Sequence, residues 1–232
     1  MVELAKSKVT TGRDILGVLV VIVIFVIFIL ALKSLSLGGE VIELDGVEIS
    51  EYEGEDLSSI NDFRENSIKG PQYVDLDEYR LRVTGLVGEE KSYTYGEVIR
   101  RQSYSKVVTL DCVEGWSATI LWEGIILREL LEEVDILDGA NTIIFHAEDG
   151  YTTSYPIGYI MDQDIMMAYK MNGLTLIPER GFPFQLVAED RWGYKWIKWI
   201  TKIEFSDDES YEGFWESRGY SNEGYLDESF FE

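Results

Sequence analysis

The sequence has 232 residues and carries 20 lysines and arginines against 43 aspartates and glutamates, which gives a formal net charge of −23. This charge argues against nucleic acid or an anionic lipid surface as a partner, because phosphate groups would be repelled. The single cysteine and single histidine exclude an intrachain disulfide, a zinc site built from several cysteines and histidines, a four-thiolate iron–sulfur cluster and a covalent CxxCH haem.

The first predicted element is an uninterrupted apolar run at residues 15–32. As a helix it would span about 27 Å, close to the ~30 Å hydrocarbon core of a bilayer. A buried core helix and a cleaved signal peptide are the alternatives. The run is apolar on every side and longer than a usual signal-peptide core, so we expect a membrane anchor at 15–33. Basic residues precede it and acidic residues follow. The positive-inside rule therefore places the N-terminus (1–14) in the cytoplasm and the domain on the extracytoplasmic side of the cell membrane.

The rest of the chain is predicted to be an acidic stalk at 34–60, one domain at 61–222 and an acidic tail at 223–232. We expect the acidic, aromatic stretch 206–232 to wrap the surface. Strand-like and helix-like segments alternate in the domain, and the Asn-Gly pair in 170–174 is typical of a tight hairpin. The other predicted elements are strands at 79–87, 184–188 and 196–205, a strand running into a turn at 141–151, and a helix at 125–134. Mixed strands and scattered helices favour an α+β fold.

Cys112 lies in VVTLDCVEGW, at the end of a strand-like run. A lone cysteine is most often a small buried apolar residue, and that interpretation stays open. A cysteine nucleophile would usually need a basic partner, and nothing in the sequence places His146, the only histidine, near it. The other functional interpretation is a thiolate metal ligand presented at the end of a strand.

Basic residues are concentrated between positions 180 and 202 of this acidic chain. They are Arg180, Arg191, Lys195, Lys198 and Lys202. Arginine offers a fixed fork of donors and lysine a point charge, and both suit phosphate, so the cluster predicts an anion site. The alternative is an amphipathic strand whose lysines point to solvent.

Seven segments, in this order along the chain, resemble the molybdopterin-binding domain of the sulfite oxidase superfamily. The likeness is greatest to its bacterial and archaeal branch, which includes the periplasmic methionine-sulfoxide reductase catalytic subunit. The segments are NDFREN (61–66), TLDCVEGWS (109–117), LWEGIILRELLE (121–132), DGYTTSYP (149–156), MAYKMNGLTL (167–176), RGFPFQLVAEDRWGYKWIKWI (180–200) and FWESRGYSN (214–222).

The resemblance implies a sulfite-oxidase-like fold with mixed sheets that binds a molybdenum-molybdopterin cofactor. Cys112 would be the catalytic residue and the protein's ligand to the metal, with further sulfurs from the pterin. The other implied cofactor contacts are Asn61, Arg64, Glu65, Arg180, Lys195, Trp196, Ile197 and Lys198. Gln185 stands where the family often has a basic residue, so one phosphate contact departs from the pattern. We expect Trp116, Tyr151, Thr152 and Ser154 to line the substrate approach.

The implied activity is that of a membrane-anchored oxidoreductase that transfers an oxygen atom, with two electrons, to or from a small substrate such as sulfite or a sulfoxide. The sequence has no haem or iron–sulfur motif, so we expect electron exchange with a separate partner, such as a membrane cytochrome or a quinone-linked subunit. One alternative is a catalytically inactive module that binds a cofactor or partner on the same fold. Another is a membrane-tethered assembly protein that docks a partner through its aromatic, acidic tail.

Overall fold

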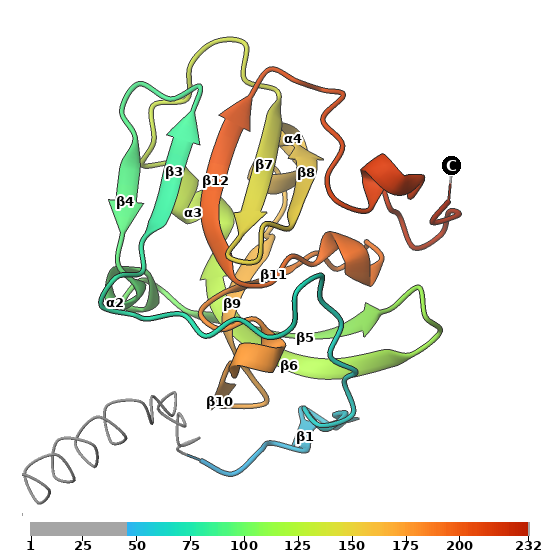
Figure 1. Cartoon of the computed structure of the whole chain (residues 1–232). Coiled ribbons are helices and arrows are strands. Elements are labelled where there is room, and N and C mark those ends of the chain that lie inside the picture. The colour runs from blue at the N-terminus through green and yellow to red at the C-terminus, as the bar shows by residue number, and fades with distance from the viewer. Residues whose placement is uncertain (1–45, 232) are drawn as a thin grey trace, which may run out of the picture. The chain divides into compact units, whose positions relative to one another are not determined.

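Two five-stranded β-sheets organise the chain in the computed structural model, which describes residues 46–231 (Figure 1). The predicted N-terminus and anchor, the first part of the stalk and Glu232 lie outside the described residues. None of the helices within 46–231 is long and apolar enough to cross a membrane.

The first sheet is antiparallel and has the strand order β10–β9–β6–β5, with β11 also pairing with β9. Its strands are β5 (Tyr104–Asp111), β6 (Ser117–Ile126), β9 (Met166–Met171), β10 (Leu174–Thr175) and β11 (Gln185–Val187). Asn172 and Gly173 join β9 to β10 with φ angles of 49° and 80°. Both angles are positive, as the tight turn of a two-residue hairpin requires, so the predicted hairpin is confirmed.

The second sheet is mixed and has the order β4–β3–β12–β7–β8. Its strands are β3 (Leu81–Gly85), β4 (Lys91–Tyr93), β7 (Thr142–Ala147), β8 (Thr152–Pro156) and β12 (Ile200–Ser206). The central strand β12 runs parallel to β3 and antiparallel to β7. This arrangement confirms the predicted mixed α+β architecture.

The helices within residues 46–231 are short connectors. They are α2 (Tyr95–Ile99), α3 (Leu127–Leu131) and α4 (Ile157–Met161), with 3₁₀ turns η1 (Pro178–Arg180), η2 (Gly193–Lys195) and η3 (Glu216–Arg218). Thr94 and Glu97 begin α2 with a reciprocal capping box, in which each side chain accepts the backbone N–H of the other residue. Residues 51–56 form a small hairpin of β1 (Glu51–Tyr52) and β2 (Glu55–Asp56).

Two predicted boundaries are wrong for reasons of tertiary packing. The helix expected at 125–134 covers only 127–131, because Ile125 and Ile126 pair with β9 as the end of β6. The strand expected at 196–205 begins only at Ile200, because Trp199 has a φ angle of 53°, which interrupts an extended backbone.

The segment 46–60 is attached to the domain. The backbone N–H of Ile49 donates to the Asn172 carbonyl at 3.0 Å, and the Asn172 amide donates to the Glu48 carboxylate at 3.0 Å. The Asn172 side-chain oxygen also accepts the N–H of Leu121. This half of the predicted stalk therefore packs on the hairpin between β9 and β10.

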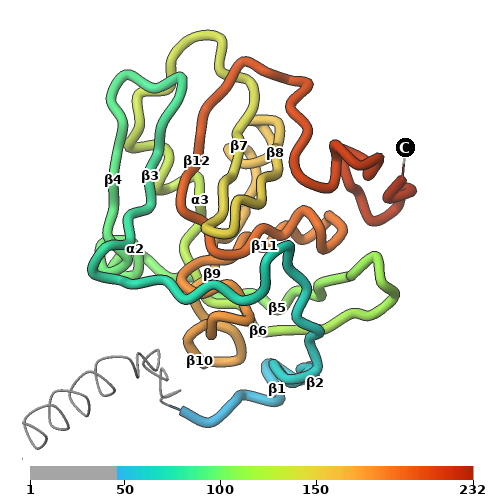
Figure 2. The backbone as a smooth tube through the Cα atoms, in the orientation of Figure 1, coloured from blue at the N-terminus to red at the C-terminus, as the bar shows by residue number. Residues whose placement is uncertain are grey.

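The C-terminal strap, defined here as residues 213–231, runs beside the stretch that contains η2 (Figure 2). The N–H of Trp192 donates to the Gly224 carbonyl at 2.9 Å, and the N–H of Leu226 donates to the Asp190 carbonyl at 3.1 Å. The predicted tail is thus held against the domain surface by backbone hydrogen bonds.

Candidate functional site

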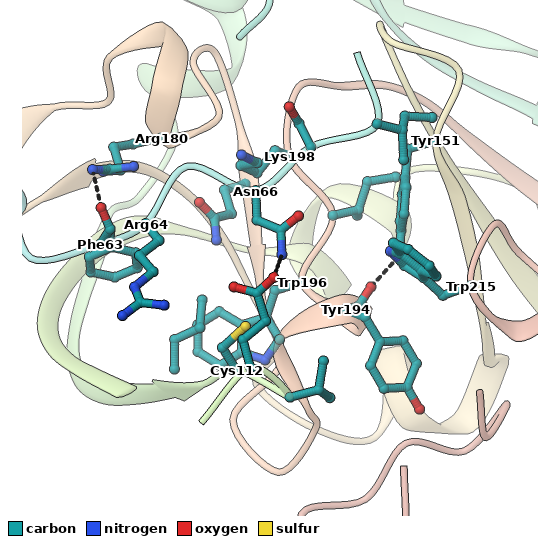
Figure 3. A pocket seen from close by; sticks show the side chains of 18 of the residues that line it. Phe63, Arg64, Asn66, Cys112, Tyr151, Arg180, Tyr194, Trp196, Lys198 and Trp215 are labelled. Atoms are coloured by element: carbon teal, nitrogen blue, oxygen red, sulfur yellow. Dashed lines mark hydrogen bonds between the residues drawn. The ribbon is translucent and has the colours of Figure 1, made fainter. Parts of the chain in front are cut away.

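A cavity of about 240 Å³ brings together five parts of the chain that are far apart in sequence. They are the loop 63–68, the end of β5 with the following turn (110–116), the turn after β7 (149–151), the stretch 179–199 and the strap residues Trp215 and Tyr220. Aromatic side chains make up much of the wall, and basic groups lie among them (Figure 3).

Cys112 lies in the turn between β5 and β6, where its sulfur faces the cavity (Figure 3). Its backbone N–H donates to the Trp116 carbonyl at 2.9 Å, which closes the turn and fixes the direction of the side chain. Burial raises the pKa of the Cys112 thiol. The Glu114 carboxylate adds to this shift, while the Glu114 N–H and the positive charge of Arg64 oppose it. A metal ion bound to such a thiol would hold it as a thiolate.

Glu114 and Asn66 lie next to the thiol, and neither residue was predicted to belong to the site. The Asn66 amide donates to the Glu114 carboxylate at 3.3 Å, and the Trp116 indole donates to its other oxygen at 3.4 Å. Glu114 follows Cys112 by two residues in the same tight turn, which was the available signal for it. Asn66 is 48 residues away, so its contact depends on the folded chain.

Two arginines reach the cavity and differ in their contacts. Arg64 is exposed, and its charge acts on the Cys112 thiol. Arg180 donates from Nε to the Ile60 carbonyl at 3.0 Å and from Nη2 to the Phe63 carbonyl at 2.8 Å, and it stacks over the Phe63 ring. The Arg180 guanidinium therefore fixes the loop that carries Arg64 into the cavity.

Lys198 is the third basic group on the cavity wall. Its ammonium donates to the Glu65 carboxylate at 3.1 Å and lies 4.3 Å from the centre of the Trp199 ring. Burial lowers the pKa of Lys198, and the Glu65 carboxylate opposes that shift. The left-handed backbone of Trp199 is a sparsely populated conformation for an aromatic residue. Such conformations concentrate at functional sites.

Lys195 is placed differently from the prediction. Its ammonium is fully buried and donates to the Glu216 carboxylate, to the Ser154 carbonyl and to the Asn222 carbonyl, each within 2.9 Å. These three bonds use all the donors of the ammonium. The predicted phosphate contact through the Lys195 side chain does not fit this geometry.

The structure thus unites most, but not all, of the predicted site residues. Those that line the cavity are Cys112, Arg64, Arg180, Trp196, Ile197 and Lys198. Asn61, Glu65 and Lys195 are not among the lining residues, although Glu65 pairs with Lys198. Of the side chains expected on the substrate approach, Trp116 and Tyr151 line the cavity. Thr152 and Ser154 instead bond to Tyr211.

The arrangement offers a soft metal ligand and an anion site within one space. Within residues 46–231, no three histidine, cysteine, aspartate or glutamate side chains gather where they could hold a metal ion. The thiol of Cys112 suits a soft metal centre, and the cationic groups of Arg64, Arg180 and Lys198 suit an anionic group such as a phosphate.

Comparison with known proteins places the chain in a family. The model of the oxidoreductase molybdopterin binding domain matches residues 68–215. The uncharacterized oxidoreductase YuiH of Bacillus subtilis (strain 168) is 33% identical over 155 residues, which covers 66% of this chain and 78% of that protein. The putative protein-methionine-sulfoxide reductase subunit YedZ1 of Azospira oryzae is 32% identical over 149 residues, or 64% of this chain and 56% of that protein.

Matches at lower sequence identity include a further relative and a solved structure. Mitochondrial sulfite oxidase of Homo sapiens is 26% identical over 188 residues, and the match covers 68% of this chain but 34% of that protein. The crystal structure of the sulfane dehydrogenase SoxCD from Paracoccus pantotrophus superposes with a TM-score of 0.58 at 22% identity, covering 66% of this chain and 43% of that one. This last likeness shows the fold alone. With the family model matching well over half of its length, the chain belongs to the oxidoreductase molybdopterin binding domain family, and it is a molybdopterin-dependent oxidoreductase.

Proposed function

We propose that this protein transfers an oxygen atom to or from a small substrate, with Cys112 as the protein's ligand to the molybdenum. The observation that carries the proposal is the Cys112 sulfur facing a cavity that also holds Arg64, Arg180 and Lys198. When bound, the molybdenum cofactor supplies the two-electron chemistry, while the protein holds the cofactor and controls access to it.

The residues present fit such a cofactor. Cys112 gives one thiolate, and the turn bond from its N–H to Trp116 holds that sulfur toward the cavity. At the anionic end of the cofactor, Lys198 is the group best placed to meet a phosphate, because its Glu65 partner is an exposed carboxylate on a surface loop. A phosphate would replace that carboxylate. Trp196 and Ile197 supply apolar surface beside Lys198.

Around the proposed metal position, the residues of the chain have separate tasks. Arg180 holds the loop 60–63 through its two carbonyl bonds and so places Arg64. The Glu114 carboxylate, held by Asn66 and Trp116, places a negative charge beside the Cys112 thiol. The aromatic side chains of the wall give the cavity a partly apolar lining.

Metal analysis tests the proposal. Protein purified from a host that makes the cofactor should contain about one molybdenum per chain, and Cys112→Ser should lose most of it, because a hydroxyl is a poor ligand for a soft metal. Glu123→Gln, which alters an ion pair with Lys170 outside the cavity, is the matched control and should keep the metal. Molybdenum-free wild-type protein from such a host contradicts the assignment.

The substrate and the electron partner are also part of the proposal. The relatives' names point to a sulfoxide or to sulfite, so the reduced enzyme should be assayed against a panel of sulfoxides and the oxidised enzyme against sulfite. We propose that electrons are exchanged with a separate membrane cytochrome or quinone-linked protein, and that the run at 15–33 anchors the domain on the extracytoplasmic side. Protease accessibility in sealed vesicles of known orientation tests the side: cleavage of the domain from the cytoplasmic face contradicts it.

A further inference from the structure

The C-terminal strap forms one wall of the cavity, and from residue 216 onward it lies beyond the part of the chain that matches the family. Trp215 and Tyr220 both line the cavity, and their ring centres are 5.2 Å apart. In Figure 3, Trp215 lies on the opposite side of Cys112 from Arg180. The strap therefore lines the side of the cavity opposite Arg180.

One buried ion pair joins the strap to η2. The Lys195 ammonium lies 2.8 Å from Glu216 Oε1, and both side chains have a relative exposure of 0%. Thr153 donates a second hydrogen bond to the same oxygen at 2.6 Å. The neighbours of this pair in sequence, Tyr194 and Trp215, are both cavity-lining residues.

This pair is poorly suited to a purely stabilising role. Burying two charges costs desolvation that their attraction often fails to repay. In addition, Glu216 Oε2 is buried and has no hydrogen-bond partner among the described residues, which adds a further cost. The carboxylate fits only because residue 213 is a glycine, since a Cβ there would lie 2.6 Å from Oε2. What the pair does provide is a fixed distance between the strap and η2.

Further contacts converge on the same segment. The Lys195 ammonium also donates to the Asn222 carbonyl at 2.8 Å, and the Tyr194 hydroxyl donates to the Ser221 carbonyl at 2.6 Å. The Arg191 guanidinium, almost fully buried, lies 3.3 Å from the centre of the Tyr225 ring. The strap is thus held on both sides of Tyr220.

We propose that Lys195 and Glu216 are positioning residues that hold the strap so that Trp215 and Tyr220 form the substrate-side wall of the cavity. This role rests on the proposed function for its effect on turnover, but the attachment of the strap can be measured without turnover. Lys195 acts here through the strap, because all three donors of its ammonium are used in the bonds to Ser154, Glu216 and Asn222.

Trypsin cleavage after Arg218 measures the attachment in the full chain. Arg218 is an exposed residue of the strap, and cleavage there needs local opening of the segment. Glu216→Gln keeps the shape of the side chain but removes its charge, so the rate of cleavage after Arg218 should rise roughly tenfold. The rate at sites elsewhere, such as after Arg101, should stay the same. Glu123→Gln, in the partly exposed pair with Lys170, should leave the pattern unchanged.

Steady-state kinetics tests whether the strap forms the substrate-side wall of the cavity. With dimethyl sulfoxide or sulfite as the probe, whichever the wild type turns over, Glu216→Gln should raise KM roughly fivefold while changing kcat less. Trp215→Leu should raise KM about tenfold through lost contact with the substrate. Molybdenum content should stay at the wild-type value in both variants, which separates this proposal from the cofactor assignment.

Two results overturn the inference. One is a Glu216→Gln protein with wild-type KM and wild-type cleavage after Arg218. The other is an equal rise in cleavage at every site, since that shows a general loss of stability. If Glu216→Gln does not fold, Lys195→Met combined with Glu216→Leu removes both charges together, and the same two measurements decide.

Discussion

At the scale of single residues, Arg180 is the clearest case of a basic side chain whose role depends on the carbonyls around it. It contributes two charge-assisted hydrogen bonds to the loop that carries Arg64. A lysine at the same place offers one point charge and cannot reach both carbonyls with a planar fork. The guanidinium therefore organises the cavity wall in addition to its charge.

Replacing Arg180 by lysine should lower the free energy of unfolding by about 2 kcal/mol, because one or both carbonyl acceptors lose a charged donor. Urea denaturation of the metal-free protein measures this loss directly. Arg82→Lys is the control, because Arg82 is exposed on β3. An Arg180→Lys protein as stable as the control shows that the loop does not depend on the guanidinium fork.

The sequence predicted the placement of a site residue where that placement depends on neighbouring residues. It did not do so where the residue contacts a partner far away in the sequence. Cys112 stands out as the single thiol in a strand-end turn, and the structure places it at the cavity. The basic cluster predicted Lys195 as a phosphate ligand. The sequence alone does not show that Glu216 lies 2.8 Å from the Lys195 ammonium in the folded chain. The contact between Asn66 and Glu114 has no signature in either segment alone.

At the scale of elements, the pairing of β7 with β12 brings the only histidine next to two charged groups. His146 Nε2 lies 2.8 Å from the Glu204 carboxylate, which also binds the Lys202 ammonium at 2.7 Å. Burial lowers the pKa of His146 below its ordinary value of 6.5. The charge of Lys202 adds to this shift, that of Arg82 contributes less, and Glu204 opposes it. The folded sheet therefore resists protonation of this imidazole.

Stability should fall as the pH drops through about 6.5, because the unfolded chain takes up a proton there that the folded chain refuses. The effect of His146 is absent above that pH and levels off below the folded-state pKa. The free energy of unfolding of the wild type and of His146→Gln, measured in urea between about pH 5 and 7.5, isolates the contribution of His146. The two proteins should differ by at most about one proton taken up on unfolding. Parallel curves for the two proteins would show that His146 does not destabilise the folded chain at low pH.

The strands and the hairpin were predictable because their patterns are local. The Asn-Gly turn and the apolar run of β7 specify their own conformations. The conformation of the stretch 196–199 was not predictable, because its alternation suits a strand. The positive φ of Trp199 accompanies a buried indole that donates to the Pro178 carbonyl, a contact that the local sequence does not show. Likewise, the helical periodicity of 125–134 is overridden at Ile125 and Ile126 by pairing with β9.

At the scale of the whole molecule, the net charge of −23 is the dominant electrostatic feature. Repulsion among so many carboxylates opposes the compact state, and dissolved ions screen it. Arg64, Arg180 and Lys198 place local positive charge at the cavity of this acidic molecule. For the redox partner proposed above, the same negative field would favour a positive docking face, since opposite charges speed encounter.

Raising sodium chloride from about 0.05 to 0.5 M should therefore stabilise the protein. A gain on the order of 1 kcal/mol corresponds to an increase in Tm of about 2–4 °C for a domain of this size. Thermal unfolding followed by circular dichroism measures it, and Cys112→Ser should show the same rise, because screening does not depend on the metal site. A Tm that falls with salt shows that local ion pairs outweigh the global repulsion.

The side chain of Asn172 has a mechanical consequence. Its amide holds the Glu48 carboxylate and the Ser58 carbonyl, while its oxygen holds the backbone of β6 through Leu121. A pull on residues 46–58 would load this side chain directly. Tension on that segment would therefore enter the first sheet at the hairpin between β9 and β10 and at the inner strand β6.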